Sequence, residues 1–200
     1  LYFLCCTFFS VSYSQVLTID VSESNFGIDD ENSLIVSRID DVEDYTELSG
    51  YTGVSIKLGD ATFEFNSLPS SLNYALSYSV MNTITAKTYD LYFSNLPIIS
   101  IETDNAISDE PKVLANLTYA DKEQTFVSNI GIEIRGGSSK SYPKKSFDIE
   151  IWEDSEGDET GDAEIGSLRE DDDWILDAIY NEPLRLRSYV ANKLWLDLHD

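Results

Sequence analysis

The sequence predicts an α+β protein, in which a β-rich N-terminal module is followed by antiparallel strands and a helix. Residues 15–96 contain short β-rich runs separated by turns, and they lack long helical periodicity. Apolar and polar residues alternate in 129–135 and in 145–152, as they do in half-buried strands. Apolar residues in 186–198 recur at the spacing of one helical face.

The composition is that of a globular and strongly acidic protein. Of the 200 residues, 42% are hydrophobic and 12% are aromatic, which is enough for a packed core. The 37 acidic and 13 basic side chains give a formal net charge of −24. Because such a surface repels nucleic acid and anionic membranes, we do not expect nucleic acid as a partner. The charge suits solubility at high ionic strength or the attraction of divalent cations.

Residues 1–14 are predicted to be the remnant of a secretory signal peptide. They are uncharged and largely apolar, and Ser12-Tyr13-Ser14 places small residues where a signal peptidase cleaves, with Gln15 as the mature start. The alternatives are a buried strand, a lipoprotein anchored through Cys5 or Cys6, and a membrane anchor, which needs about 20 apolar residues. We therefore expect a secreted or cell-surface protein with no integral membrane segment in the mature chain.

The positions of the cysteines and of the histidine exclude several kinds of catalytic and metal site. Both cysteines lie in residues 1–14, and the single histidine is His199, so we expect no disulfide framework, thiolate metal site or His-based triad. The start at Leu1 and the stop directly after a helical pattern lead us to expect part of a longer protein. Its segments would be the signal-peptide remnant, a β-rich accessory domain at 15–95 and a C-terminal domain at 96–200.

The β-rich accessory domain is predicted to be a small sandwich-like module. Its apolar and β-branched runs form six candidate strands: 16–21, 34–36, 53–58, 61–65, 74–80 and 89–93. Gly59-Asp60 separates two of these runs and is typical of a tight hairpin turn. Short strands with frequent turns are characteristic of sandwiches.

The C-terminal domain is predicted to contain further strands and one helix. The candidate strands are 98–103, 113–119, 124–127, 129–135, 145–152 and 173–178. Asn181-Glu182-Pro183 is predicted to start the helix, because Asn can cap it, an acid suits its first turn and Pro is tolerated there. Its apolar stripe consists of Leu186, Val190, Leu194 and Leu198.

The connection between the two alternating strands concentrates groups that suit a phosphate-bearing ligand. Gly136, Gly137, Ser138 and Ser139 combine flexible backbone with hydroxyl groups, and glycine lets backbone N–H groups approach phosphate closely. The pattern is neither a Walker loop nor GxGxxG. Gly-Gly-Ser-Ser is also an ordinary hairpin loop, so both interpretations stay open at this point.

Strand alternation separates the two lysines that follow this connection. Lys145 has the parity of Phe147 and Ile149, the predicted core face, where an ammonium group needs an anionic partner such as phosphate. The alternative is that Lys145 lies at the mouth of the strand and reaches water. Lys144 has the opposite parity and is expected to be solvated. Arg135 can add a second cation, or it can form a salt bridge to a residue such as Glu133.

The acidic run of 154–164 invites a calcium interpretation, which its register contradicts. In an EF-hand loop starting at Asp154, Glu159 stands where glycine is required and Ile165 stands where the bidentate glutamate belongs. Runs of like charge are usually solvated loops. We therefore expect a mobile acidic loop and assign no metal-binding residue.

Three blocks of the sequence, in order, resemble the spore-coat CotH family of atypical protein kinases. They are Leu96 to Ile101; Ile134 to Ser139 with Pro143 to Ser146; and Asp172 to Leu176 followed by Leu186-Arg187. The resemblance covers about residues 96–200, the front part of that family's domain. The family usually has Asn at the position of Gly137 and often has Asn at the position of Ser188.

The resemblance implies a kinase-like fold and a nucleotide cofactor. Members of the family are similar to distant, secreted relatives of protein kinases that bind ATP with a divalent metal, here Mg or Mn, and phosphorylate Ser or Thr of extracellular proteins. By this resemblance, 130–151 is the phosphate-covering hairpin of an N-lobe, with Lys145 as its lysine. The helix at 183–198 is its supporting helix, and Arg187 can reach phosphate or a structural acid.

Two functions from different classes follow. The first is part of a secreted protein kinase acting on extracellular or cell-surface proteins, whose catalytic aspartates are expected beyond residue 200, so that residues 1–200 alone should be inactive. The second is a non-catalytic adhesion or coat-structure protein that uses the same fold.

Overall fold

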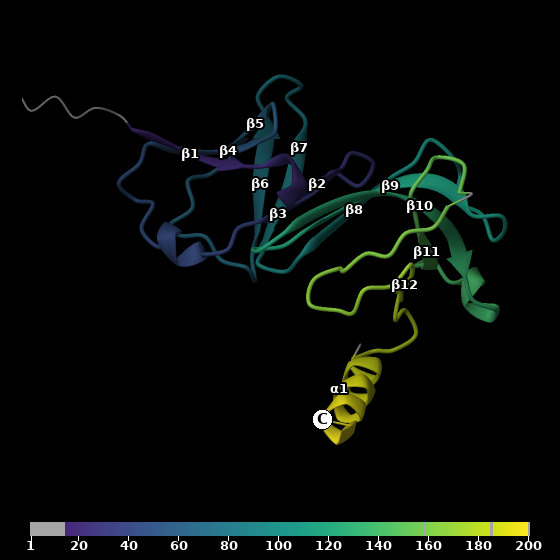
Figure 1. The fold of residues 1–200 in the computed structure, drawn as a ribbon. Helices are drawn as coiled ribbons and strands as arrows, with labels where there is room; N and C mark the ends of the chain where they lie inside the picture. The colour runs from purple at the N-terminus through teal and green to yellow at the C-terminus, as the bar shows by residue number, and fades with distance from the viewer. Residues whose placement is uncertain (1–14, 158, 185, 200) are drawn as a thin grey trace, which may run out of the picture. The chain divides into compact units, whose positions relative to one another are not determined.

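The computed structural model describes residues 15–157, 159–184 and 186–199. These residues form two compact units, which divide between Ile98 and Ile99, and each unit is described by itself. The described residues contain two β-sheets and one α-helix, which confirms an α+β class at this level (Figure 1).

The first unit consists of a seven-stranded sheet and two short 3₁₀ turns. Its strands are β1 (Val16–Val21), β2 (Phe26–Asp29), β3 (Leu34–Arg38), β4 (Gly53–Leu58), β5 (Ala61–Phe65), β6 (Ser77–Asn82) and β7 (Thr88–Ser94). They are arranged in the order β1-β4-β5-β6-β7-β3-β2. The β1–β4 and β3–β7 pairs are parallel, and the other pairs are antiparallel.

This sheet is rolled, as its connectivity requires. The chain passes from the edge strand β1 to the opposite edge strand β2 between Val21 and Phe26, a span of at most about 17 Å. Seven strands laid flat would hold these edges about 29 Å apart. Hydrogen bonding runs unbroken from β1 to β2, so the strands predicted to form a small sandwich-like module form one continuous, rolled sheet.

The side chains inside this unit form a single hydrophobic cluster. Ile35, Ile56, Val80 and Leu91 are fully buried in it. The predicted strands 53–58 and 61–65 are confirmed, and Gly59 makes their turn at a φ of +56°. The sequence missed β2, and the strand predicted at 74–80 begins only at Ser77.

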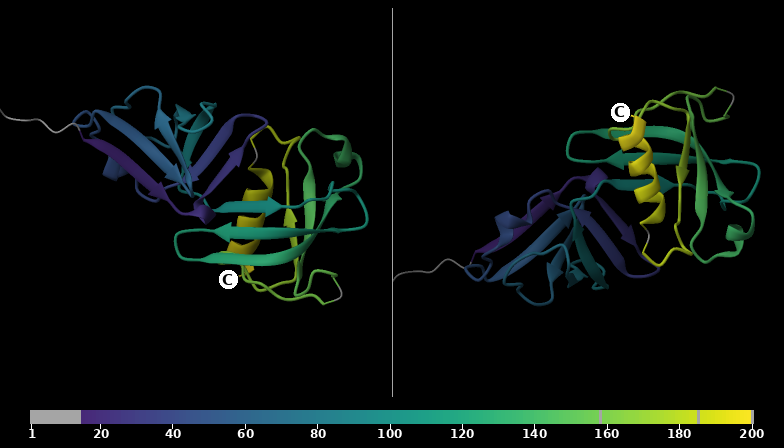
Figure 2. Two further views of the ribbon diagram at one scale, coloured as in Figure 1. Left: turned by 90° about the horizontal axis from the view of Figure 1, so that it is seen from above. Right: turned by 90° about the horizontal axis from the view of Figure 1, so that it is seen from below.

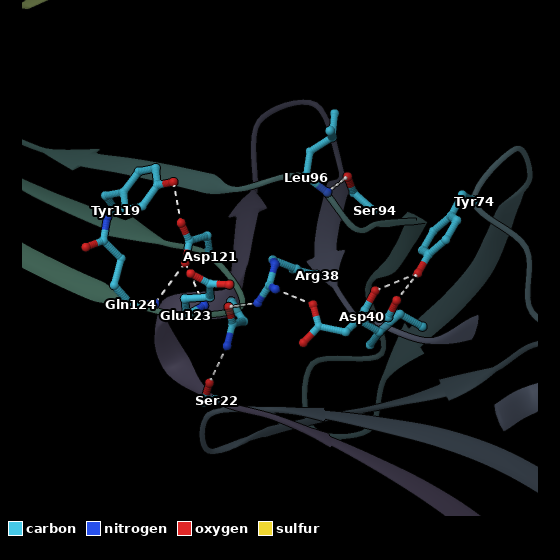
Figure 3. Close-up of polar contacts among 12 residues, drawn as sticks. Ser22, Arg38, Asp40, Tyr74, Ser94, Leu96, Tyr119, Asp121, Glu123 and Gln124 are labelled. Carbon is cyan, nitrogen blue, oxygen red and sulfur yellow. Dashed lines mark hydrogen bonds and ion pairs between the residues drawn. The ribbon is translucent and has the colours of Figure 1, made fainter. Parts of the chain in front are cut away.

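One end of the first unit contains a buried cation. Arg38 is 6% exposed, pairs with the Asp40 carboxylate and donates to the Asn25 side-chain oxygen at 3.1 Å. The Tyr74 hydroxyl donates to the carbonyl oxygen of Asp40 at 2.8 Å (Figure 3). These bonds fix the segment that follows β3.

The second unit contains a five-stranded sheet whose strand order follows the sequence. Its elements are β8 (Ile98–Glu102), β9 (Val113–Ala120), β10 (Thr125–Arg135), β11 (Ser146–Trp152), β12 (Asp173–Leu176) and α1 (Arg187–His199). The β9–β10, β10–β11 and β11–β12 pairs are antiparallel (Figures 1 and 2). The two strands predicted at 124–127 and 129–135 form one strand, β10.

The Asp121 side chain organises the tight turn between β9 and β10. Its carboxylate accepts hydrogen bonds from the backbone N–H groups of Glu123 and Gln124, at 2.7 and 2.8 Å. It also accepts a bond of 2.6 Å from the Tyr119 hydroxyl (Figure 3). This turn explains the long register of the β9–β10 pair, which runs from Thr125↔Ala120 to Ile132↔Val113.

One face of this sheet is apolar and packs into a hydrophobic core. Ile130, Ile132 and Ile149 are at most 1% exposed, as the alternation predicts. Ala163 and Ile165, from the connection between β11 and β12, belong to the same core. These two side chains anchor the acidic connection to the sheet. The prediction of a solvated loop did not include this contact, because two apolar residues are inconspicuous among so many charged ones.

The helix begins later than the sequence predicts. Pro183 and Leu184 lie in a turn, and α1 starts at Arg187. The cap is the buried carboxylate of Glu182, which accepts the backbone N–H of Arg187, and not the side chain of Asn181. The apolar side chains Leu186, Val190 and Leu194 are about half exposed. Within the described ranges, no helix is long and apolar enough to cross a bilayer.

Candidate functional site

The hairpin of β10 and β11 positions the residues that the sequence singled out. Its last paired residues are Arg135 and Ser146, so residues 136–145 form the connection. Ser138–Ser141 form a single 3₁₀ turn there. The Ser141 hydroxyl donates to the carbonyl oxygen of Ser138 at 2.8 Å, which tightens this turn.

The first of the two glycines is required by the geometry. Gly136 has a φ of +116°, and a Cβ atom at this position would lie 2.0 Å from the Ser139 hydroxyl oxygen. At Gly137 a Cβ atom would meet nothing within 4 Å. The loop backbone is therefore open beside Gly137 and tightly folded at Gly136.

Several backbone donors of the loop take no part in its internal hydrogen bonds. The loop carbonyls of Gly137 and Ser139 accept from the N–H groups of Lys140 and Tyr142, at 3.2 and 3.0 Å. Within the described part of the chain, the N–H groups of 136–139 have no hydrogen-bond acceptor. Such donors suit an anion, although water serves them equally well.

Lys144 and Lys145 differ in exposure, and both precede the first residue of β11. Lys144 is exposed, and Lys145 is half-buried. Strand β11 begins only at Ser146, so Lys145 lies at the mouth of the strand. Its ammonium group donates to the main-chain carbonyl of Lys140, a partner that the sequence did not suggest. Arg135 is exposed at the end of β10.

A second cation in the loop, Lys140, has a partner from a distant part of the sequence. Its ammonium group forms a salt bridge with the carboxylate of Asp109. Asp109 lies in the connection between β8 and β9, which is held to β10 by a 2.7 Å bond from the Ile134 N–H to the Ser108 carbonyl. Sequence reasoning missed this pair because 31 residues separate its members.

The loop contains a cluster of basic residues in an otherwise acidic protein. Arg135, Lys140, Lys144 and Lys145 lie within eleven residues, and the stretch 134–147 contains no acidic residue. The whole chain has 37 acidic against 13 basic residues. Such a local excess of basic side chains suits an anionic ligand.

The segment after β12 packs against the same hairpin. The Ser146 hydroxyl accepts the N–H of Ala178 at 3.0 Å and lies 3.3 Å from a carboxylate oxygen of Asp177. The ring of Tyr180 lies 5.4 Å from that of Tyr142, between centroids, at an angle of 33°. Contacts of Tyr142 and Ser146 therefore hold the C-terminal end of the loop in place.

The remaining candidate residue, Arg187, lies at the start of α1. Its Nε atom is 3.5 Å from the Glu182 carboxylate, and its side chain is 81% exposed. Glu182 is buried, so the carboxylate that caps α1 also orients the guanidinium group. An apolar hollow of about 590 Å³ lies beside this helix end, lined partly by Pro183, Leu186 and Val190.

The second face of the sheet has a polar cluster that the sequence did not suggest. Lys112 lies 3.7 Å from the Glu150 carboxylate and 4.0 Å from that of Asp173. Partial burial raises the pKa of the Asp173 carboxyl above its ordinary value, and repulsion from Asp172 adds to this, whereas Lys112 acts in the opposite direction. The Asp173 side chain is 65% exposed, so water screens these interactions.

Gly131 lies beneath the indole ring of Trp152 on this second face. A Cβ atom at Gly131 would lie 2.2 Å from the ring. The indole N–H donates to Glu150 at 2.9 Å. Of the residues that the structure describes, no group of three or more His, Cys, Asp or Glu side chains is placed to hold a metal ion.

One family model matches part of the chain. No curated protein and no solved structure matches it. The family model described as CotH kinase protein matches residues 132–199, which include the Gly136–Lys145 loop, β11, β12 and α1. The resemblance suggested by the sequence motifs is thus confirmed over this range.

Proposed function

We propose that this chain carries the phosphate-binding part of a secreted, CotH-like protein kinase, which binds ATP with Mg or Mn and phosphorylates Ser or Thr of extracellular or cell-surface proteins. The main support for the proposal is the cluster of basic residues at 135–145, which lies within the residues that the family model matches. In the kinase-like interpretation, the β10–β11 hairpin covers the phosphates and α1 supports the hairpin. Secretion rests on the predicted signal peptide, which lies outside the described residues.

The residues of the loop have the chemistry that ATP phosphates require. Glycines at 136 and 137 leave the backbone N–H groups of 136–139 accessible, and Lys145 and Arg135 are nearby cations. Arg187 is an exposed guanidinium group near α1's start. The proposal assigns these residues to binding and identifies no catalytic base among them.

A second function is favoured by one specific observation. The ammonium groups of Lys145 and Lys140 both have protein partners, a carbonyl and a carboxylate. A hairpin whose cations are satisfied internally also suits a non-catalytic adhesion or coat-structure protein that keeps the fold. In such a protein the two lysines hold the loop shape and bind no phosphate.

Nucleotide binding separates the two functions. The affinity of the full-length protein for ATP is measured by calorimetry with Mg and then Mn, and transfer of labelled phosphoryl groups to casein or to the protein itself is followed in parallel. Binding of ATP that needs a metal and is lost with Gly136→Val supports the kinase. Failure to bind ATP with either metal overturns the kinase proposal and leaves the adhesion or coat function.

A further inference from the structure

We propose that Lys140 is an additional phosphate-binding cation of the loop and that the Asp109 carboxylate competes with phosphate for its ammonium group. The inference rests on the proposed nucleotide-binding function and deepens it. Neither residue is part of the motif that suggested the site. The salt bridge between them joins two connections of the second unit, β8–β9 and β10–β11.

The main chain holds Lys140 close to the glycine backbone. Its N–H donates to the carbonyl oxygen of Gly137 at 3.2 Å, and its own carbonyl accepts the Lys145 ammonium group. Both bonds keep the Cα atom of Lys140 within one 3₁₀ turn of the N–H groups of Gly137 and Ser138. The side chain of a lysine at this position is long enough to contact an anion that those N–H groups would bind.

The Asp109 carboxylate supplies the charge and the oxygen atoms that a phosphate group would supply. It comes from outside the loop, and the bond from Ile134 N–H to Ser108 holds its connection in place. The Lys140 and Asp109 side chains are 34% and 58% exposed, so the salt bridge is accessible to a ligand. Exposed ion pairs are weak, and a phosphate group with more charge can replace the carboxylate at small cost.

Because it competes for Lys140, the Asp109 carboxylate should lower the affinity of the loop for anions. With the carboxylate in place, the ligand must displace it before reaching Lys140, so the observed affinity is lower than that of the free loop. Asp109→Asn keeps the shape and removes the competing charge. We expect about two- to fivefold tighter binding of anions, the range that corresponds to one exposed ion pair. Lys140→Met removes the cation and should weaken binding about tenfold.

The test uses the full protein and two probes, ATP with Mg and inorganic tripolyphosphate, measured by calorimetry. Asp104→Asn is the matched control, because Asp104 is an exposed acid of the same β8–β9 connection. It removes the same charge and should change the affinity little. Thermal unfolding of each variant checks that it folds, and Asp109→Ser serves as a second variant of the competing position.

A double-mutant cycle decides whether the two residues act on one another. If Asp109 acts through Lys140, Asp109→Asn tightens binding in the wild type and has no effect in Lys140→Met. Equal effects of Asp109→Asn and Asp104→Asn, or no effect of Lys140→Met, overturn the inference while the nucleotide-binding function stands. Tripolyphosphate binding with the expected cycle, but no preference for ATP, supports the inference and contradicts the kinase. Failure of both probes to bind overturns both.

Discussion

The ammonium group of Lys145 donates a hydrogen bond to the main-chain carbonyl of Lys140, five residues earlier in the same loop. This bond closes the turn of Ser138–Ser141 against the start of β11. Lys145 therefore has a structural role whatever else it binds. The neighbouring Lys144 is exposed and has the opposite parity, so the two lysines form a matched pair for mutation.

The first prediction concerns this pair. Lys145→Met should lower the affinity of the full-length protein for ATP with Mg or Mn by about one to two orders of magnitude, because a charge-assisted contact to phosphate contributes about 1.5–3 kcal/mol. Lys144→Met, the control, should have little effect. Calorimetric titration of both variants measures the difference. Equal and small effects would show that the loop is only a hairpin, and a larger loss at Lys144 would contradict the assignment of faces.

The second prediction concerns Gly131 under the Trp152 ring. Gly131→Ala should destabilise the second unit by about 1–3 kcal/mol, because the added methyl group would lie 2.2 Å from the indole and the ring must move. Chemical denaturation measures the loss. Gly27→Ala is the control, since a methyl group there meets nothing within 4 Å. If Trp152→Leu does not reduce the cost of Gly131→Ala, the ring is not its cause.

The third prediction tests the anchor of the acidic connection. Ile165 is 9% exposed and packs in the core of the sheet. Ile165→Ala should therefore lower the free energy of unfolding by about 2–4 kcal/mol. Leu168→Ala, in the same connection but 58% exposed, should change it by less than about 0.5 kcal/mol. Similar small changes in both variants would mean that this connection detaches readily from the sheet.

The fourth prediction concerns calcium at Glu153–Glu164. The Asp154 carboxylate accepts the N–H groups of Glu156 and Gly157, at 3.0 and 2.6 Å, so it is used in forming its own turn. The EF-hand register also fails at Glu159 and Ile165. Titration calorimetry should detect no binding tighter than about 10⁻⁴ M, the range of weak extracellular modules. Tighter binding that is lost with Asp154→Asn would contradict this prediction.

Local alternation predicted the strands that carry the candidate site. Ile130, Ile132 and Ile149 are buried as expected, because a period of two along a strand places them all on one face. Strand β10 was split in the prediction at Ser128, whose polar side chain interrupts the apolar run. The pairing with β9 overrides this local signal, since Ser128 is paired with Leu117 in an unbroken register.

Features that depend on distant residues could not be predicted in this way. The rolling of the first sheet follows from strand order, and Asp109 reaches Lys140 across 31 residues. The start of α1 was misplaced because Asn181 is a good local cap, whereas the actual cap, Glu182, acts on the N–H of Arg187 five residues later. The loop motif was visible in the sequence, but the partners of its lysines were not.

The last prediction concerns the charge state of Asp173. Partial burial and then the repulsion of Asp172 raise the pKa of its carboxyl, and Lys112, 4.0 Å away, lowers it. Lys112→Met should therefore raise the pKa of Asp173 further, which ¹³C NMR titration of the carboxyl group measures directly. Lys122→Met, an exposed lysine of the β9–β10 turn, is the control and should leave that pKa unchanged.

The raised pKa of Asp173 also makes the stability of the fold depend on pH. The folded pKa of Asp173 lies above its unfolded value of about 3.9, so the folded state takes up the proton more readily. Asp173 therefore favours folding as the pH falls through its folded pKa and opposes folding above it. Asp173→Asn should remove this part of the pH dependence and leave the second unit slightly more stable at neutral pH. A pKa of Asp173 at or below its ordinary value, or a loss of stability in Asp173→Asn at neutral pH, would show that the attraction of Lys112 outweighs burial.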